Sequence, residues 1–328
     1  MNKFPAIFGI KGKNLSDDEV AFFKDINPYG YIIFARNIES GSQLTELVNS
    51  IKALAGGDIA ILVDQEGGRV ARLKPPVVAE LYPPAASFTA LAQKDLDEAR
   101  AQVFKNYYKI GTDLKSFGIN VDCAPMADLL TSDSHNIIGD RSFGTDVDIV
   151  VALSQAAAFG LWAAGVQPIL KHLPGHGRAT VDSHQDLPVV KAELSELETT
   201  DFNVFKQLNP LPAWVMTAHV VYDALDEEHC FTVSKKGIDY ARTKLGYHNH
   251  LVLSDDLSMK ALSGGVGNNA TCAIQAGCDV ILHCNGDLAE MKEIAQALTD
   301  LEVPLISPTN IEELIQSIKI PEFYTEFV

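Results

Sequence analysis

Residues 58–64 have the sequence DIAILVD, in which an unbroken apolar run ends in an aspartate. Such a run has no polar side to face water, as expected of a parallel strand that helices cover on both faces. Seven other stretches have the same character, and each is followed by a segment with the periodicity of a helix. They are PAIFGI (5–10), YGYIIFA (29–35), INVDCAP (119–125), VQPILKH (166–172), AWVMTAHV (213–220), HLVLSD (250–255) and CDVILHC (278–284).

Eight successive strand–helix units predict a single α/β barrel of the (β/α)8, or TIM, type. The units are evenly spaced, and no linker rich in proline or serine divides them into halves. We therefore expect residues 1–328 to form one domain. A doubly wound open sheet is the alternative, and it is less favoured because no G-x-G-x-x-G sequence follows the first strand.

The composition limits the classes of function. The chain has 328 residues, of which 47% are apolar and 21% charged, so it can bury a large core. Its formal net charge of −17 disfavours nucleic acid or an anionic membrane as a partner, because their phosphates would be repelled. Five cysteines without a C-x-x-C pair indicate neither a disulfide framework nor a zinc ribbon. Without a stretch that could span a bilayer or a signal-peptide cleavage pattern, we expect a soluble, cytoplasmic protein.

Polar residues follow several of the predicted strands, at the end where barrel enzymes have their active sites. Any one of them alone fits a hydrogen-bonded residue of the barrel rim. Because they would converge on one face, together they predict an active site. These residues are Asp64, Asp128, Lys171, His172, His219, Asp255 and Asn285.

The segment KHLPGHGRATVDSHQDLP (171–188) contains three of the nine histidines and raises the question of a metal site. His172 and His176 have the spacing of two ligands on one helix face. Pro174 and Gly175 lie between them, however, and a helix would not persist there. The H-x-H sequence that metal-dependent amidohydrolase barrels have after their first strand is also missing. We therefore predict no metal.

The same segment contains VDSH, in which Asp182 and His184 would point to the same side of an extended backbone. A carboxylate beside an imidazole fixes its tautomer and favours its charged form. The free ring nitrogen can then give and retake a proton, as general acid–base catalysis requires. A surface His–Asp pair is the structural alternative.

Two adjacent carboxylates end the apolar strand in LSDDLSM (253–259). Neighbouring residues of a strand face opposite ways, so Asp255 and Asp256 cannot share a role. We expect one to enter the site and the other to cap the following turn, and alternation alone does not say which.

The segment LVDQEGGRVARL (62–73) has Asp64 at a strand end, with Arg69 and Arg72 nearby. Aspartate can accept paired hydrogen bonds from sugar hydroxyls, and arginine can bind a hydroxyl or carboxylate through two donors. Structural ion pairing is the alternative for each arginine.

Taken together, these stretches resemble glycoside hydrolase family 3, and within it the bacterial β-N-acetylglucosaminidases (β-hexosaminidases) of peptidoglycan recycling. The similarity runs from about the second strand to the eighth, in the family's order and spacing. The matching segments are DQEGGRVARL, GDRSFGTD (139–146), KHLPGHGRATVDSH and SDDLSM.

The resemblance implies a role for each matching residue. Asp255, the first aspartate of SDD, would be the nucleophile, and His184 would be the proton donor and acceptor with Asp182 as its partner. The resemblance also implies a (β/α)8 barrel without metal or cofactor. The residues that would hold N-acetylglucosamine are Asp64, Arg72, Arg141, Lys171 and His172.

The implied reaction is retaining hydrolysis through a covalent glycosyl-aspartate. The implied substrate is N-acetylglucosamine β-1,4-linked to 1,6-anhydro-N-acetylmuramic acid, with or without its peptide, and no obligatory protein partner is implied. The alternatives are a glycoside phosphorylase, a metal-dependent amidohydrolase and a non-catalytic muropeptide sensor. Residues 227–250, Arg178 and Lys260 depart from the family pattern and leave the fine substrate preference open.

Overall fold

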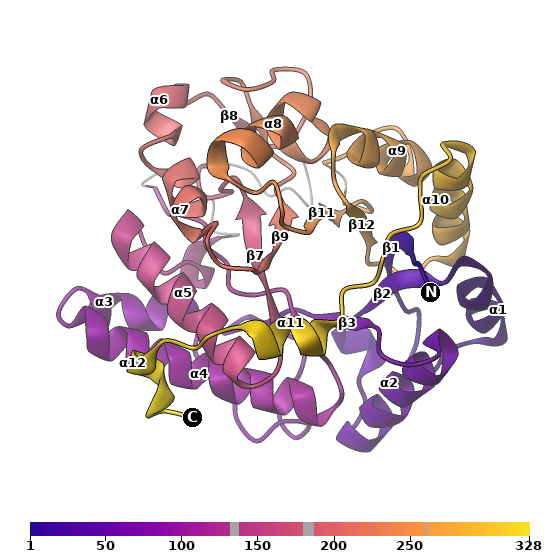
Figure 1. Cartoon of the computed structure of the whole chain (residues 1–328), viewed down its shortest axis with the longest axis horizontal. Coiled ribbons are helices and arrows are strands. Elements are labelled where there is room, and N and C mark those ends of the chain that lie inside the picture. Colours follow the sequence, from indigo (N-terminus) through magenta and orange to yellow (C-terminus); the bar gives the residue numbers. More distant parts are fainter. Residues whose placement is uncertain (132–137, 180–186, 260) are drawn as a thin grey trace.

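Eight parallel strands close into a barrel (Figure 1). The computed structural model describes residues 1–131, 138–179, 187–259 and 261–328. Around the barrel the strands follow the order β1, β12, β11, β9, β7, β6, β3, β2, and β2 pairs with β1 again. Each overlaps one of the eight predicted stretches, so the (β/α)8 prediction is confirmed and the open sheet is wrong. The strands are β1 (Phe4–Gly9), β2 (Pro28–Ile33), β3 (Ala60–Val63), β6 (Val121–Asp122), β7 (Gln167–Leu173), β9 (Trp214–Thr217), β11 (Val252–Asp256) and β12 (Val280–His283).

Helices surround the barrel, and the local sequence sets where they begin. Before the first helix, the Ser16 hydroxyl accepts the Glu19 N–H (3.2 Å) and the Glu19 carboxylate accepts the Ser16 N–H (2.9 Å), which is a capping box. The longer helices are α1 (Asp17–Ile26), α2 (Gly41–Ala55), α4 (Leu96–Ser116), α5 (Val147–Ala163), α7 (Asp201–Leu208), α9 (Val266–Ala276) and α10 (Leu288–Asp300). The shorter helical segments are η1 (Ala35–Asn37), η2 (Ala85–Phe88), α3 (Thr89–Ala92), η3 (Gly139–Arg141), α6 (Leu194–Leu197), η4 (Phe231–Val233), α8 (Lys235–Tyr240), η5 (Ala241–Leu245), α11 (Ile311–Ser317) and α12 (Glu322–Thr325).

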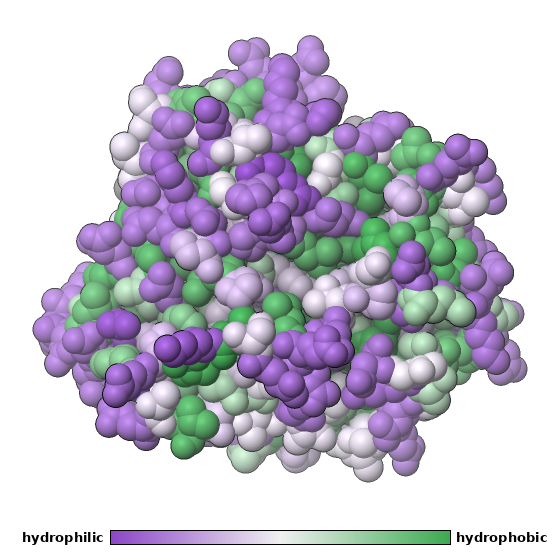
Figure 2. Space-filling model, in the orientation of Figure 1, coloured by the Kyte–Doolittle hydropathy of each residue, from purple (hydrophilic) through white to green (hydrophobic). Residues whose placement is uncertain are grey.

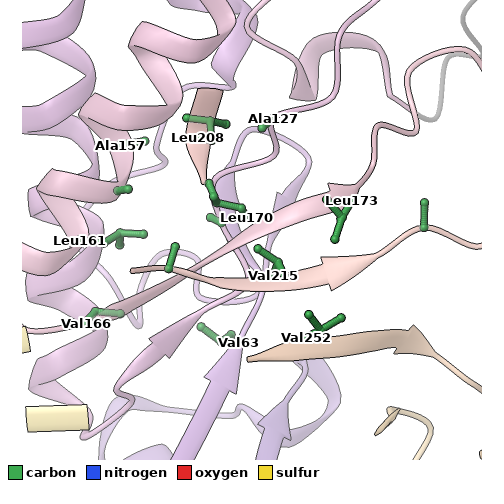
Figure 3. Close-up of a cluster of buried hydrophobic side chains, with 14 of the residues drawn as sticks. Val63, Ala127, Ala157, Leu161, Val166, Leu170, Leu173, Leu208, Val215 and Val252 are labelled. Carbon is green, nitrogen blue, oxygen red and sulfur yellow. The ribbon is translucent and has the colours of Figure 1, made fainter. Parts of the chain in front are cut away.

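Alternating side chains of the strands belong to two separate cores, which explains why the strands are apolar on both faces. In β7, Ile169 belongs to the core inside the barrel, whereas Leu170 belongs to the core between barrel and helices. Figure 3 shows part of this outer core, with Leu170 near Ala157 and Leu161 of α5. The inner core includes Ile7, Ile32, Leu62, Val121, Ile169, Trp214, Met216, Leu253, Val280 and Leu282.

Part of the segment after α10 lies at the amino end of the barrel. Ile311 of α11 packs into the inner core, and the hydroxyl of Thr309 lies 2.7 Å from that of Tyr29. Farther along, the ring of Tyr324 stacks on Phe104 of α4, with ring centroids 4.7 Å apart. The opposite, carboxyl end of the barrel carries two short sheets, β4 (Gln65–Gly67) with β5 (Val70–Ala71) and β8 (Val189–Val190) with β10 (Val221–Tyr222).

The surface seen in the orientation of Figure 1 is largely hydrophilic, with smaller apolar areas between the polar ones (Figure 2). Among the described residues, no helix combines the length and the apolar character that crossing a membrane requires.

Candidate active site

A pocket of about 270 Å³ opens at the carboxyl ends of the barrel strands. It brings together the predicted site residues that the structure describes, although they are up to 191 positions apart in the sequence (64 to 255). Asp182 and His184 lie outside the described residues. The predicted residues that line the pocket are Asp64, Arg72, Arg141, Lys171, His172 and Asp255.

One wall of the pocket is a network of buried ion pairs. The Lys171 ammonium nitrogen lies 2.9 Å from an Asp64 oxygen and 2.6 Å from a Glu66 oxygen. Arg72 bonds to the other Asp64 oxygen (2.8 Å). Arg141 binds both oxygens of Glu66 at 2.7 and 2.8 Å, so this pair is bidentate. The structure therefore bears out the ion-pairing alternative for Arg72, whose pair with Asp64 lines the pocket, and for Arg69, which pairs with Asp140 (3.0 Å).

The network keeps its members charged. Burial alone would raise the pKa of Glu66, but Arg141 and Lys171 outweigh it and lower that pKa to about 2. In the same way Lys171 and Arg72 hold the pKa of Asp64 well below its ordinary value, against the effect of burial. With two carboxylates and three cations, the wall presents ionised donors and acceptors at neutral pH. The Nε atom of Arg72 is buried without a hydrogen-bond partner among the described residues.

A hairpin after β3 holds this wall in place. The Gln65 side chain is buried and accepts the backbone N–H groups of Arg72 (2.8 Å) and Leu73 (3.0 Å). Gly67 has φ = 96°, and a Cβ there would lie 2.4 Å from the Pro83 carbonyl oxygen, so this turn requires glycine. Gln65 thereby fixes the spacing between the two residues that pair, Asp64 and Arg72.

Asp128 organises the next part of the site. Its carboxylate accepts the ring Nδ1–H of His172 (2.7 Å) and the backbone N–H groups of His172 (3.1 Å) and His176 (2.7 Å). Burial would raise the pKa of Asp128, but the ring of His172, together with His176 and its backbone N–H, lowers it to about 2. Because Nδ1 of His172 donates to Asp128, its Nε2 is the nitrogen left for a ligand.

His176 lines the same pocket and has its ring 5.5 Å from that of His172. Burial and the neighbouring His172 lower the pKa of His176 to about 4, so its ring is neutral at pH 7. Its backbone N–H donates to the Asp128 carboxylate (2.7 Å) and so helps to hold the chain that follows β7. In the part of the chain that the structure describes, no three histidine, cysteine or carboxylate side chains are arranged to hold a metal ion.

The two carboxylates at the end of β11 have different surroundings. Asp255 has the same strand face as Leu253 of the inner core and lines the pocket. Asp256 accepts hydrogen bonds from the backbone and hydroxyl of Ser258 (3.0 and 2.7 Å) and from the Cys284 N–H (3.0 Å). Both aspartates line the pocket, but Asp256 also caps the following turn through these bonds.

Burial would raise the pKa of Asp255, but electrostatic interactions with the neighbouring His219 and His172 act against it, and the pKa lies below the ordinary value. Asp255 is therefore ionised at neutral pH and available as a nucleophile or an electrostatic partner.

Sequence reasoning missed Glu66 as a site residue and gave Asp128 and His219 no specific role. Glu66 stands two positions after Asp64, and this spacing in an extended strand would have placed both on one face. Arg178, a departure from the family pattern, bonds to Asp201 (2.6 Å) at the start of α7 and to Glu196 (2.7 Å) in α6.

A family model described as the glycosyl hydrolase family 3 N terminal domain matches residues 6–318. The chain belongs to glycoside hydrolase family 3. It is similar to a β-hexosaminidase of Alkalilimnicola ehrlichii, with 36% identity over 286 residues, 86% of this chain and 80% of the relative. A β-hexosaminidase of Nitrosomonas eutropha is 33% identical over 284 residues, again 86% of this chain and 80% of the relative. The predicted family and the glycoside hydrolase class are confirmed.

Solved structures give the same result. NagZ from Neisseria gonorrhoeae in complex with N-trifluoroacetyl-D-glucosamine has a TM-score of 0.83 and 28% identity, covering all of this chain and 96% of that one. A family 3 β-N-acetylglucosaminidase from Paenibacillus sp. str. FPU-7 has a TM-score of 0.84 and 31% identity over 95% of this chain. This chain spans only 59% of the length of the Paenibacillus protein.

Proposed function

We propose that the protein is a retaining β-N-acetylglucosaminidase that releases terminal N-acetylglucosamine from peptidoglycan fragments. The observation that carries the proposal is a pocket in which a wall of ionised donors and acceptors shares its space with the ionised carboxylate of Asp255. Such a wall can bind several hydroxyl groups at once, and the carboxylate can attack the anomeric carbon of the sugar it holds.

The pocket suits one sugar ring of this type. The hydroxyls would exchange hydrogen bonds with Asp64, Arg72 and Lys171, and the buried Arg72 Nε offers a donor for a ligand oxygen. Apolar side chains such as Met216 and Leu282 also line the pocket and would contact the less polar faces of the ring. The β-hexosaminidase names of the relatives and the N-acylated glucosamine bound by the Neisseria protein support N-acetylglucosamine as that ring.

The proposed reaction has two steps. In the first, an Asp255 oxygen forms a bond to the anomeric carbon while the bond to the leaving oxygen breaks, and His184 gives that oxygen a proton. In the second, neutral His184 removes a proton from water, whose oxygen bonds to the anomeric carbon as the bond to Asp255 breaks. Asp182 would orient the ring of His184 and favour its protonated form. The roles of Asp182 and His184 rest on the sequence, because both lie outside the described residues.

The leaving group that we propose is 1,6-anhydro-N-acetylmuramic acid, with or without its peptide, and the compartment is the cytoplasm. Both follow from the resemblance to enzymes of peptidoglycan recycling. A phosphorylase would use the same nucleophile with phosphate in the place of water, so the two reactions differ only in the second step.

An aryl β-N-acetylglucosaminide and the natural disaccharide test the proposal together. We expect release of N-acetylglucosamine from both, with retention of the β configuration in the first-formed sugar, at a rate independent of added phosphate. Turnover that requires phosphate, with a sugar phosphate as product, would make the protein a phosphorylase. The absence of turnover on either compound would contradict the proposed function.

A further inference from the structure

His219, which follows β9, is fully buried below the pocket and is not part of the proposed sugar-binding wall. Its Nε2 lies 3.0 Å from the carbonyl oxygen of Asp256 and its Nδ1 lies 2.8 Å from the hydroxyl of Thr232. A peptide carbonyl can only accept a hydrogen bond, so Nε2 must carry a proton. The charge of His219 then depends on whether Nδ1 donates to Thr232 or accepts from it.

The hydrogen bonds around Thr232 indicate the direction. Its hydroxyl donates to the carbonyl of Ala218 (3.1 Å), which uses its only proton. The hydroxyl of Thr217 lies 2.8 Å away, and since Thr232 has then no proton left for it, Thr217 would be the donor of this bond. Thr217 itself accepts the backbone N–H of Asp255 (3.3 Å), so the chain of bonds begins at the proposed nucleophile. One acceptor position remains on Thr232, and the Nδ1–H of His219 fills it.

We propose that His219 is an imidazolium at neutral pH that acts as the counter-charge of Asp255, a positioning role in the hydrolysis proposed above. Both ring nitrogens then donate to oxygen atoms, the Asp256 carbonyl and the Thr232 hydroxyl. The inference rests on the proposed function, because it gives His219 its role through Asp255.

Electrostatics agree with this arrangement. Burial would lower the pKa of His219, but the side chain of Cys230, the charge of Asp255 and the Asp256 carbonyl together raise it to about 9. After burial, His219 is also the largest influence on the pKa of Asp255, which it lowers.

The other charged groups near Asp255 already have partners. His172 bonds to Asp128, and Lys171 pairs with Asp64 and Glu66. His176 is neutral at pH 7. The Asp256 carboxylate is occupied by the turn that follows it. Within the described residues, His219 is the buried cation near Asp255 that forms no ion pair with another carboxylate.

The charge would act in both steps of the reaction. Before the first step it keeps Asp255 ionised as the pH falls. In the second step the bond between the anomeric carbon and Asp255 breaks, and its electron pair returns to the carboxylate, where the imidazolium stabilises it. Loss of the charge should therefore slow hydrolysis of the glycosyl-enzyme more than its formation.

His219→Gln tests the proposal, and His250→Gln is the matched control, because His250 bonds a backbone carbonyl at the opposite end of the barrel. An activated aryl β-N-acetylglucosaminide needs little leaving-group protonation. The fall of its kcat/KM at low pH (the acid limb of the pH profile) therefore reflects protonation of Asp255. In His219→Gln we expect that limb to move up by about one pH unit or more. We also expect kcat and KM to fall together, kcat by about tenfold or more, with a larger burst of aryl product. His250→Gln should change neither the acid limb of the kcat/KM profile nor the size of the burst of aryl product.

Two further measurements do not depend on that variant folding. In the wild-type protein, the 15N signals of His219 should show both nitrogens protonated at pH 7 and titration near pH 9. Thr232→Val, which removes the Nδ1 acceptor, should move the acid limb in the same direction by a smaller amount. An unshifted acid limb in a folded His219→Gln, or a neutral His219 ring at pH 7, would overturn the inference. Failure of the wild-type enzyme to hydrolyse the aryl glycoside would instead contradict the proposed function.

Discussion

The two ends of the barrel both contain hollows lined by polar side chains, yet these side chains have different partners. At the amino end, a hollow of about 550 Å³ contains Arg242, which bonds the carbonyl oxygens of Tyr247, His250 and Gly277 as well as Asp279. At the carboxyl end, the smaller pocket contains side chains that bond mainly to one another, as in the network around Glu66 and Lys171.

This difference distinguishes polar side chains that stabilise the fold from polar side chains that can bind a ligand. Polar groups that bind the main chain fix the positions of the strands, and they leave little for a ligand. Charged groups that are buried in pairs beside an open pocket are costly to desolvate, and they provide preorganised donors and acceptors for a substrate. The volume of a hollow therefore does not identify the candidate active site. The hydrogen-bond and ion-pair partners of the side chains that line it do.

The largest effect that we expect comes from the two aspartates at the carboxyl end of β11. Asp255→Ala should abolish turnover of an aryl β-N-acetylglucosaminide, because the nucleophile is lost. Asp256→Asn should fold and keep measurable activity, because Asn can still accept a hydrogen bond from the turn. Steady-state kinetics of both purified variants provide the measurement, and an exchange of the two results would show that the assignment is wrong.

A smaller effect is expected when one ion pair is removed from each end. Arg141→Met leaves Glu66 without its bidentate partner and should lower kcat/KM by about 10²–10³-fold. Arg242→Met removes the pair with Asp279 and should lower the melting temperature while kcat/KM stays within about twofold. Kinetics and thermal unfolding of the same two samples compare the ends directly. If Arg242→Met impaired kcat/KM as much as Arg141→Met, the distinction between the ends would fail.

A third prediction concerns stability and pH. Burial raises the pKa of Asp122 to about 8, and one of its oxygens has no hydrogen-bond partner among the described residues. Between pH about 4 and about 8 the folded chain keeps a proton that the unfolded chain has released, so stability falls across this window. Asp122→Asn should remove that loss, and its melting temperature relative to wild type should rise from pH 4 to pH 8.

The control for Asp122 is Asp279. Its carboxylate accepts hydrogen bonds from the Arg242 guanidinium and from the backbone N–H of Val252, both at 2.8 Å. Asp279→Asn should lower the melting temperature at neutral pH, opposite in sign to Asp122→Asn. A pH-independent difference between Asp122→Asn and wild type would contradict the proposed protonation of Asp122.

The smallest effect is expected from a chelator. Dialysis against a chelator should leave the aryl glycosidase rate unchanged, because Pro174 and Gly175 separate His172 from His176 in a way that does not suit two ligands of one ion. Loss of activity that zinc restores would return the amidohydrolase alternative.

The sequence predicted the barrel well because the strands are apolar on both faces and alternate regularly with helical segments. It could not predict which carboxylate partners each cation, because Lys171 and Glu66 are 105 positions apart and meet only through barrel closure. Alternation left the roles of Asp255 and Asp256 open, and the hydrogen bonds that Asp256 accepts from Ser258 and Cys284 are ones that no local pattern predicts. The charge of His219 depends on the direction of hydrogen bonds between threonines that no local pattern reveals.

The most direct test of a glycosyl-aspartate on Asp255 is to trap it. A fluorinated N-acetylglucosaminide with a good leaving group should form the covalent intermediate faster than the intermediate is hydrolysed. Mass spectrometry after trypsin digestion should then find one added fluorinated glycosyl group on the peptide of residues 245–260, with fragmentation assigning it to Asp255. Modification of any other residue, or normal turnover by Asp255→Ala, would contradict the proposed mechanism.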